Sequence, residues 1–169
     1  MPKTTRAPKK PAAPPAAVPS YWLIKSEPTV YAWTRLQQDG RTMWDGVRNF
    51  EARNNLRAMR EGDLCFFYHS NEGKELVGVV KVVRAAYPDP TAPGEDWSVV
   101  DVAPAYPLKK TVGLDAIKEA PELAEMQMLT RNRLSVTRVT AAQWTFLHGL
   151  AATSGRPPKA KPVAEKVGK

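Results

Sequence analysis

The sequence predicts an α+β domain in which a curved antiparallel sheet, or a small barrel, carries helices at its ends. Two observations indicate this fold class. Short runs of β-favouring residues follow one another with turns or short helical segments between them, so most of the full crossover helices of a doubly wound parallel sheet are missing. The chain has 169 residues, 43% of them hydrophobic, which suits one domain around its own core.

A short strand and a helix open the predicted domain. Residues 21–25, YWLIK, are aromatic and apolar and favour a strand. The segment 26–40 is predicted to form a helix, because Ser26 can serve as its N-cap and Pro28 suits its first turn. Gly40 lies just past the end of this helix, where a glycine is often found.

An irregular loop and a second helix come next. Residues 41–48, RTMWDGVR, show neither helical nor strand periodicity. Residues 49–60 are predicted to form a helix that Asn49 opens and Gly62 closes. The face of this helix that we expect to point inward contains Ala52, Leu56 and Met59.

The second half of the domain is rich in strands and ends in a helix. Strands are predicted over 63–70, 75–87, 97–106 and 133–139. The first two are joined by SNEGK, a hairpin loop, and Gly78 in the second allows a bulge or a close backbone approach. Residues 114–129 favour short helical pieces around Pro121, and Thr140 caps a final helix. We expect Trp33 and Trp144 to be core residues on helix faces.

The net charge of +8 lies in two tails. Residues 1–20 and 152–169 are rich in proline, alanine and lysine and are predicted to be disordered. Between them, residues 21–151 hold equal numbers of basic and acidic residues. Basic tails attract polyanions by neutralising phosphates, although a purely solubilising role explains them as well.

Several classes of protein are disfavoured by the composition. The single cysteine, Cys65, rules out a disulfide framework, and neither a metal-binding spacing nor a glycine-rich phosphate loop is evident. No apolar run approaches the roughly 20 residues that a membrane-spanning helix needs, and no apolar signal segment opens the chain. We therefore expect a cytoplasmic monomer that needs no cofactor and no metal and contacts no membrane.

Arginines gather on one face of the predicted helix 49–60. Arg53, Arg57 and Arg60 fall at positions i, i+4 and i+7. This row is either a solvated face that complements the helix dipole, or a ridge that binds phosphate oxygens in a bidentate manner. A second basic group holds Arg131, Arg133 and Arg138, whereas residues 87–101 carry only acids. We therefore expect one positive and one negative side.

Polar side chains gather where two predicted strands end. Lys25 and Ser26 end the first strand, and Tyr68, His69, Ser70 and Asn71 end a later one. A cation and hydroxyls beside free backbone amides can form the wall of a polar pocket. The structural alternatives are that Lys25 only reaches along the surface to water, that Ser26 only caps a helix, and that the hairpin tip needs these residues for its turn.

Trp44 stands out in the loop 41–48, next to Asp45 and Gly46. Neither a helix nor a strand needs a large aromatic residue at such a turn. The tryptophan either packs beneath the loop or offers a flat surface to a ligand.

Six motifs resemble the EVE domain, a family of the PUA-like superfamily. In the family's order they are YWLIKSEP, MWDGVRNFEARN, LRAMREGDLCFFYHSN, LVGVVKVV, AYPD and RLSV. The resemblance extends from about Tyr21 to Leu150, which is nearly the whole predicted domain. The resemblance implies a PUA-like fold, which is a curved antiparallel or mixed barrel of five to six strands flanked by helices.

The resemblance also implies a nucleic-acid-binding module that flips a modified base into a pocket, most often a modified cytosine in DNA such as 5-methylcytosine. Related YTH domains read a methylated adenine in RNA through an aromatic cage. Trp44 matches a cage aromatic and would stack on the flipped base. Because no second aromatic maps onto this chain, we expect one stacking platform with a hydrogen-bonding rim.

The resemblance assigns the pocket to four segments. Its loop holds Trp44, Asp45, Val47, Arg48 and Asn49, and its first wall holds Lys25 and Ser26. The opposite wall holds Tyr68, His69, Ser70 and Asn71, and the closing strand holds Arg133, Leu134 and Ser135. We expect backbone phosphates to be contacted by Arg53, Arg57, Arg60 and Arg131.

Two alternatives stay open at this point. Other PUA-like domains bind modified RNA, and the sequence does not separate RNA from DNA. Some PUA-like relatives are small amidohydrolases that use a lysine and a glutamate, which Lys25 and Glu27 could supply. Pro28 argues against the hydrolase, because it places Glu27 in the first turn of a helix. Binding to DNA would bring a cytoplasmic bacterial protein to the nucleoid.

Overall fold

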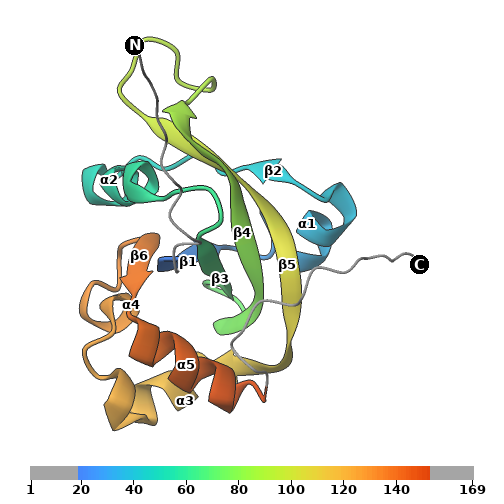
Figure 1. Ribbon diagram of the computed structural model, residues 1–169, viewed down its shortest axis with the longest axis vertical. Helices are drawn as coiled ribbons and strands as arrows, with labels where there is room; N and C mark the ends of the chain where they lie inside the picture. Colours follow the sequence, from blue (N-terminus) through green and yellow to red (C-terminus); the bar gives the residue numbers. More distant parts are fainter. Residues whose placement is uncertain (1–18, 153–169) are drawn as a thin grey trace, which may run out of the picture.

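One six-stranded sheet organises the molecule, whose computed structural model describes residues 19–152. The strands lie in the order β2-β5-β4-β3-β1-β6 (Figure 1). Their bounds are Tyr21–Ser26 for β1, Thr42–Met43 for β2, Leu64–His69 for β3, Glu75–Pro88 for β4, Ser98–Gly113 for β5 and Val136–Val139 for β6. The predicted α+β class is confirmed. The sheet is open rather than a closed barrel, because its edge strands β2 and β6 do not pair with each other.

Helices cover both faces of the sheet. Among the described residues they are α1 (Trp33–Asp39), α2 (Phe50–Ala58), α3 (Leu114–Glu119), α4 (Gln127–Thr130), α5 (Ala141–Leu150) and the 3-10 turn η2 (Pro121–Leu123). Within the described residues, every helix is too short or too polar to cross a bilayer. The short pieces predicted around Pro121 are confirmed as α3, η2 and α4.

Alternation along the strands divides the core into two layers. In β3, Cys65 and Phe67 belong to the layer that includes Trp33, whereas Phe66 belongs to the layer that includes Trp144. This division follows from the two-residue period of a strand, which sends neighbouring side chains to opposite faces. Trp33 and Trp144 are both buried, as predicted.

The parallel pair β1 and β3 positions the polar strand ends. The other strand pairs are antiparallel, but β1 pairs with β3 in parallel, with Lys25 opposite Tyr68 and Ser26 opposite His69. The amide of Ser70 then donates to the carbonyl of Ser26 over 2.9 Å. Because the carboxyl ends of parallel strands meet at one edge of the sheet, the two polar clusters predicted from the sequence become neighbours.

The predicted helix 26–40 is wrong over its first half. Ser26 belongs to β1, and its hydroxyl donates to the carbonyl of Tyr31 over 2.6 Å. The amides of Val30 and Tyr31 bond to the carbonyl of Glu27 in a turn, and α1 begins only at Trp33. His69 accepts the amide proton of Trp33 over 3.1 Å. The helix start is therefore set by a residue from β3 and not by a local cap.

The other predicted helix boundaries depend on neighbours in sequence, and three are confirmed. Asn49 accepts the amide of Ala52 at the start of α2, and Thr140 forms a capping box with Gln143 at the start of α5. Gly40 ends α1 with a left-handed φ of 76°. In contrast, α2 ends before Gly62, because Met59 is its C-cap.

The predicted disordered tails, 1–20 and 152–169, lie outside the described residues except for Pro19, Ser20 and Ala152. Ser20 already belongs to the fold, since its amide donates to the Asp63 carboxylate over 3.0 Å.

Candidate nucleic-acid interface

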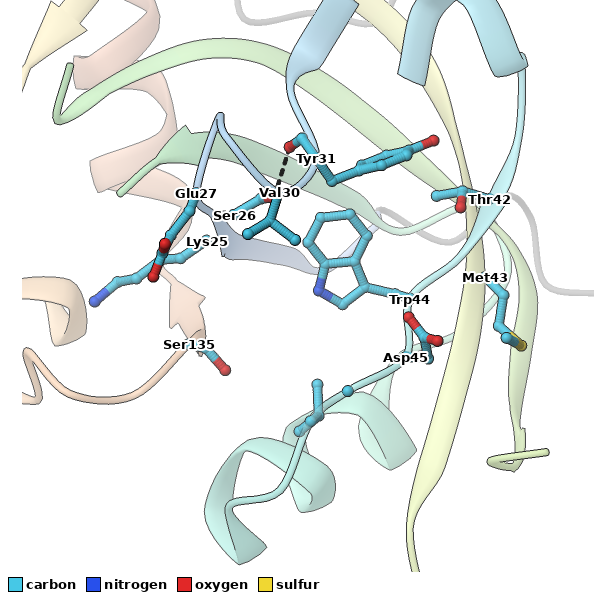
Figure 2. A pocket seen from close by; sticks show the side chains of 12 residues that line it. Lys25, Ser26, Glu27, Val30, Tyr31, Thr42, Met43, Trp44, Asp45 and Ser135 are labelled. Carbon is cyan, nitrogen blue, oxygen red and sulfur yellow. Dashed lines mark hydrogen bonds between the residues drawn. The ribbon is translucent and has the colours of Figure 1, made fainter. Parts of the chain in front are cut away.

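A pocket of about 500 Å³ opens at the edge of the sheet where β1 ends (Figure 2). Its walls are the end of β1, the turn before α1, the segment from β2 toward α2, and the residue before β6. It is lined by Lys25, Ser26, Glu27, Val30, Tyr31, Thr42, Met43, Trp44, Asp45, Gly46, Val47 and Ser135. This size falls within the range of sites that bind small organic ligands.

The segment that carries Trp44 is anchored at both ends. The amide of Trp44 donates to the carbonyl of Val100 in β5 over 2.7 Å, and Asn49 fixes the other end as the cap of α2. Between them, Gly46 has a φ of 80°, which most other residues adopt only with strain. Trp44 and Asp45 are thereby held at the pocket.

Trp44 is a wall of the pocket and part of the core. Its side chain is only 8% exposed. Its ring meets Phe67 edge-on, with centroids 5.6 Å apart and planes at 79°, and meets Tyr31 at 6.3 Å and 78°. The indole is therefore less open than the stacking platform we expected, and only part of it faces the pocket. Within residues 19–152 the indole N–H has no hydrogen-bond acceptor, and the ring nitrogen lies on the side toward Ser135 in Figure 2.

Tyr31 is a second aromatic residue in the pocket, which sequence reasoning missed. Its hydroxyl donates to Asp39 over 2.7 Å. Burial raises the pKa of this hydroxyl. Tyr31 was assigned to a helix, whereas it lies in the turn before α1. Pro28 was the signal that could have shortened that helix, because a proline disfavours the helical conformation in the residue before it.

The rim of the pocket holds donors and acceptors that are not engaged within the described chain. The Ser135 hydroxyl and the carboxylates of Glu27 and Asp45 have no hydrogen-bond or ion-pair partner among residues 19–152. The Ser26 hydroxyl, in contrast, already donates to Tyr31.

Lys25 reaches out of this pocket. Its Nζ donates to the carbonyl of Asn132 over 3.0 Å, and Figure 2 shows its side chain running away from Trp44. Partial burial lowers the pKa of its ammonium. Glu27 follows β1 in an exposed turn, so it is not in the first turn of a helix, as we had expected.

The structure brings together six of the fourteen pocket residues expected from the resemblance: Lys25, Ser26, Trp44, Asp45, Val47 and Ser135. That these six contact a base stays a prediction. Tyr68, Ser70 and Asn71 line a neighbouring pocket that shares Lys25. The other members lie elsewhere: Asn49 caps α2, His69 caps α1, Leu134 is buried and Arg133 is exposed.

Arg48 also lies outside the pocket lining, in a cluster with Asp89 and Trp97. Its guanidinium donates to the Asp89 carboxylate over 3.0 Å and lies 5.6 Å from the centre of the Trp97 ring. Trp97 stacks on Phe50, with centroids 5.2 Å apart. Burial pushes the pKa of Asp89 upward, but hydrogen bonds from Thr91 and Arg48 outweigh it and leave the pKa lowered.

The expected division into a positive and a negative side is wrong. The acidic loop between β4 and β5 packs against the arginine face of α2, where Asp96 accepts from both Arg53 and Arg57. The hydrogen bond from Arg57 is the main reason that the pKa of Asp96 is lowered. Arg131 is paired with Glu51. Three of the four arginines assigned to phosphate contact are therefore already in ion pairs, whereas Arg60 has no ion-pair partner in the described chain.

No group of three or more His, Cys, Asp or Glu residues within residues 19–152 is arranged to hold a metal ion. His69 is engaged as an acceptor for Trp33. His148 is buried, with its ring nitrogens on the Trp144 carbonyl and the Tyr106 hydroxyl, each at 2.9 Å.

Comparisons with known proteins agree with the fold. Residues 20–150 match the EVE domain. The chain is 34% identical over 168 residues to thymocyte nuclear protein 1 of Mus musculus, covering 79% of this chain and 74% of the mouse protein. A crystal structure of a protein from Agrobacterium tumefaciens is similar with a TM-score of 0.80 and 39% identity, over 84% of this chain and 99% of that one.

One similar structure contains DNA. Human THYN1 protein, solved in complex with 5-methylcytosine containing DNA, matches with a TM-score of 0.74 and 32% identity, over 85% of this chain and 99% of that chain. The matched family, the identity to the mouse protein and the agreement of the folds lead to one conclusion: this chain belongs to the EVE domain family.

Proposed function

We propose that this protein is a DNA-binding module that takes a flipped 5-methylcytosine into the pocket beside Trp44. The observation that carries the proposal is the pocket itself, where a partly accessible indole stands beside polar groups that have no partner within the described chain. The similarity to human THYN1 protein, solved with 5-methylcytosine containing DNA, supports the choice of ligand.

The chemistry of the rim suits the hydrogen-bonding edge of cytosine. Cytosine presents an amino group at N4 as a donor, and acceptors at N3 and O2. The carboxylates of Asp45 and Glu27 can accept from N4, as acidic residues do when they read cytosine. The Trp44 N–H and the Ser135 hydroxyl can donate to N3 or O2.

The same chemistry disfavours thymine. Thymine also has a 5-methyl group, but it presents a carbonyl at C4 and a donor at N3. A carboxylate that faces this carbonyl has no hydrogen-bond donor to accept from. An unpaired buried polar group costs more binding free energy than the loss of one methyl contact does. The pocket therefore selects cytosine over thymine mainly through hydrogen bonds.

The 5-methyl group itself gives a smaller preference. Val30, Met43 and Val47 supply apolar surface in the pocket, and Val30 is 76% exposed. Burying one methyl group contributes about 0.8 kcal/mol, which is about fourfold in affinity. We expect the order 5-methylcytosine, cytosine, thymine, with the second step larger than the first.

Fluorescence anisotropy with three otherwise identical duplexes tests this order. Each duplex carries 5-methylcytosine, cytosine or thymine at one position, opposite a mismatched base that eases flipping. The Trp44→Phe variant keeps a ring in the core but lacks the indole donor, and it should lose most of the cytosine preference. Trp97→Phe, outside the pocket lining, is the matched control and should keep it. Equal affinity of the native protein for all three duplexes at low and high salt would contradict the proposal that the pocket selects a base. An RNA competitor with the same modification tests the RNA alternative.

A further inference from the structure

A second pocket, of about 260 Å³, lies beside the first, and Lys25 lines both. It is formed by the end of β3, the β3–β4 loop, α3 and the segment between α4 and β6. Its polar lining consists of Lys25, Tyr68, Ser70, Asn71, Lys74, Lys118 and Asn132, and no carboxylate is among the described residues that line it. We call it the lysine pocket.

The three lysines are available to an anion. None of Lys25, Lys74 and Lys118 has an ion-pair partner in the part of the chain that the structure describes. The single hydrogen bond of the Lys25 Nζ, to the Asn132 carbonyl, leaves two of its protons free. The arginines of α2 differ, because Arg53 and Arg57 both form ion pairs with Asp96. The lysine pocket therefore offers positive charge that no carboxylate among its described lining residues compensates.

The backbone holds Lys74 and Lys118 on the same pocket. The carbonyl of Lys74 accepts the amide of Leu114 over 2.8 Å, which ties the β3–β4 loop to the first residue of α3. Lys118 lies one helical turn after Leu114, and both residues line the pocket. Lys74 itself has a φ of 49°, a conformation that a lysine rarely adopts.

We propose that the lysine pocket binds a backbone phosphate of the DNA strand that carries the recognised base. Lysine ammonium groups bind phosphate as point charges, and phosphate contacts fix the position of a strand without reading its sequence. Lys25 connects the two sites, because it lines both pockets and its ammonium donates to the carbonyl of Asn132, which also lines the lysine pocket. The proposal rests on the proposed function, since the phosphate belongs to the same strand as the base.

A salt titration of duplex binding by the full chain tests the phosphate site. The variants are Lys118→Gln and Lys74→Asn, because asparagine tolerates the left-handed backbone at position 74. Lys81→Gln is the matched control, an exposed lysine of β4 opposite Leu64, at the other end of β3. Thermal unfolding checks that each variant folds.

We expect each pocket variant to lower the slope of log Kd against log salt by about 0.9, and to weaken binding by about fivefold at 0.15 M salt. Duplexes with 5-methylcytosine and with cytosine should be weakened by the same factor, so the preference stays. Lys81→Gln should leave the slope unchanged. Slopes that stay native in both pocket variants, or fall equally in Lys81→Gln, would overturn the lysine pocket.

Free 5-methyl-2′-deoxycytidine and its monophosphates separate this proposal from the proposed function. The nucleoside has no phosphate, so the Lys118→Gln variant should bind it as the native protein does, while losing affinity for the 5′- or the 3′-monophosphate. An equal loss for nucleoside and nucleotides contradicts the phosphate assignment alone. No nucleoside binding together with no duplex preference contradicts the base pocket, whereas a reduced salt slope would still support the lysine pocket.

Discussion

Replacing Gly78 by alanine should destabilise the domain, although alanine is normally the better residue in a strand. A Cβ at position 78 would lie 2.4 Å from Cη2 and Cζ2 of the Trp33 indole. Real Cβ atoms do not come so close, so the strand or the indole has to move. The bulge predicted at Gly78 is confirmed, because the register of β4 against β5 shifts between Leu76 and Gly78. The group that comes close is the Trp33 side chain and not another backbone segment.

The size of the effect follows from how little Trp33 can move. The indole is buried, lies 5.5 Å from the Phe67 ring at 61°, and belongs to the first residue of α1. Overpacking of this kind costs about 1–3 kcal/mol, against a gain of about 0.5–1 kcal/mol from replacing a strand glycine by alanine. We expect a net loss of roughly 1–2 kcal/mol, or roughly 3–8 °C in Tm for a domain of this size.

Calorimetry or urea unfolding measures this loss of stability. Two further variants test whether the clash with Trp33 is its cause. Gly149→Ala, in α5 with open space around the position, should be neutral or stabilising by up to about 1 kcal/mol. Trp33→Leu should reduce the additional cost of Gly78→Ala in a double-mutant cycle, because the clashing ring is gone. A Tm for Gly78→Ala at or above that of the native protein would refute the packing explanation.

Three further predictions concern a cap, a pH dependence and the reading of cytosine. Asn49→Ala should lower the unfolding free energy by about 1 kcal/mol, because the α2 cap is lost, and Asn49→Ser should restore most of it in urea unfolding. Burial lowers the pKa values of His69 and His148 in the folded protein. Below the ordinary histidine pKa of about 6.5, the unfolded chain therefore binds more protons at these two rings than the folded protein does. The stability that these neutral rings contribute is then present above that pH and is lost as the pH falls toward the folded values. The urea concentration at the unfolding midpoint should decrease when the pH is lowered from 7 to 5, and this decrease should be smaller in the His148→Gln variant. A midpoint that rises on acidification contradicts this prediction. The double variant Glu27→Gln, Asp45→Asn should reduce the preference for cytosine over thymine by about tenfold, which is within the 1–3 kcal/mol that one specific base contact contributes. An unchanged preference in the anisotropy assay would show that these carboxylates do not recognise the cytosine amino group.

Features that depend on neighbours in sequence could be predicted. Asn49 and Thr140 were identified as caps because the donor each one satisfies lies within the next few residues. Five of the six strands in the described residues were found through their alternation and their turn residues, whereas the two-residue β2 lies in the segment 41–48 that was predicted to be irregular. Trp33 and Trp144 were assigned to the core because both lie on apolar helix faces.

Features that depend on distant contacts were missed. The start of α1 is fixed by His69, which comes from β3 and accepts the Trp33 amide. The Ser26 hydroxyl consequently bonds to Tyr31 instead of capping a helix, and Tyr31 enters the pocket. The pairing of Asp96 with the arginines of α2 likewise depends on how the β4–β5 loop folds back. Local patterns contain no information about such pairings.

The indole N–H signal of Trp44 gives the most direct test of the base pocket. In ¹⁵N-labelled protein, assigned with the Trp44→Phe variant, this signal is followed during titration with 5-methyl-2′-deoxycytidine. We expect the Trp44 signal to move and to saturate with the nucleoside while the Trp97 signal stays, because only Trp44 lines the pocket. A Trp44 signal that does not move at saturating nucleoside would contradict a base pocket at this position.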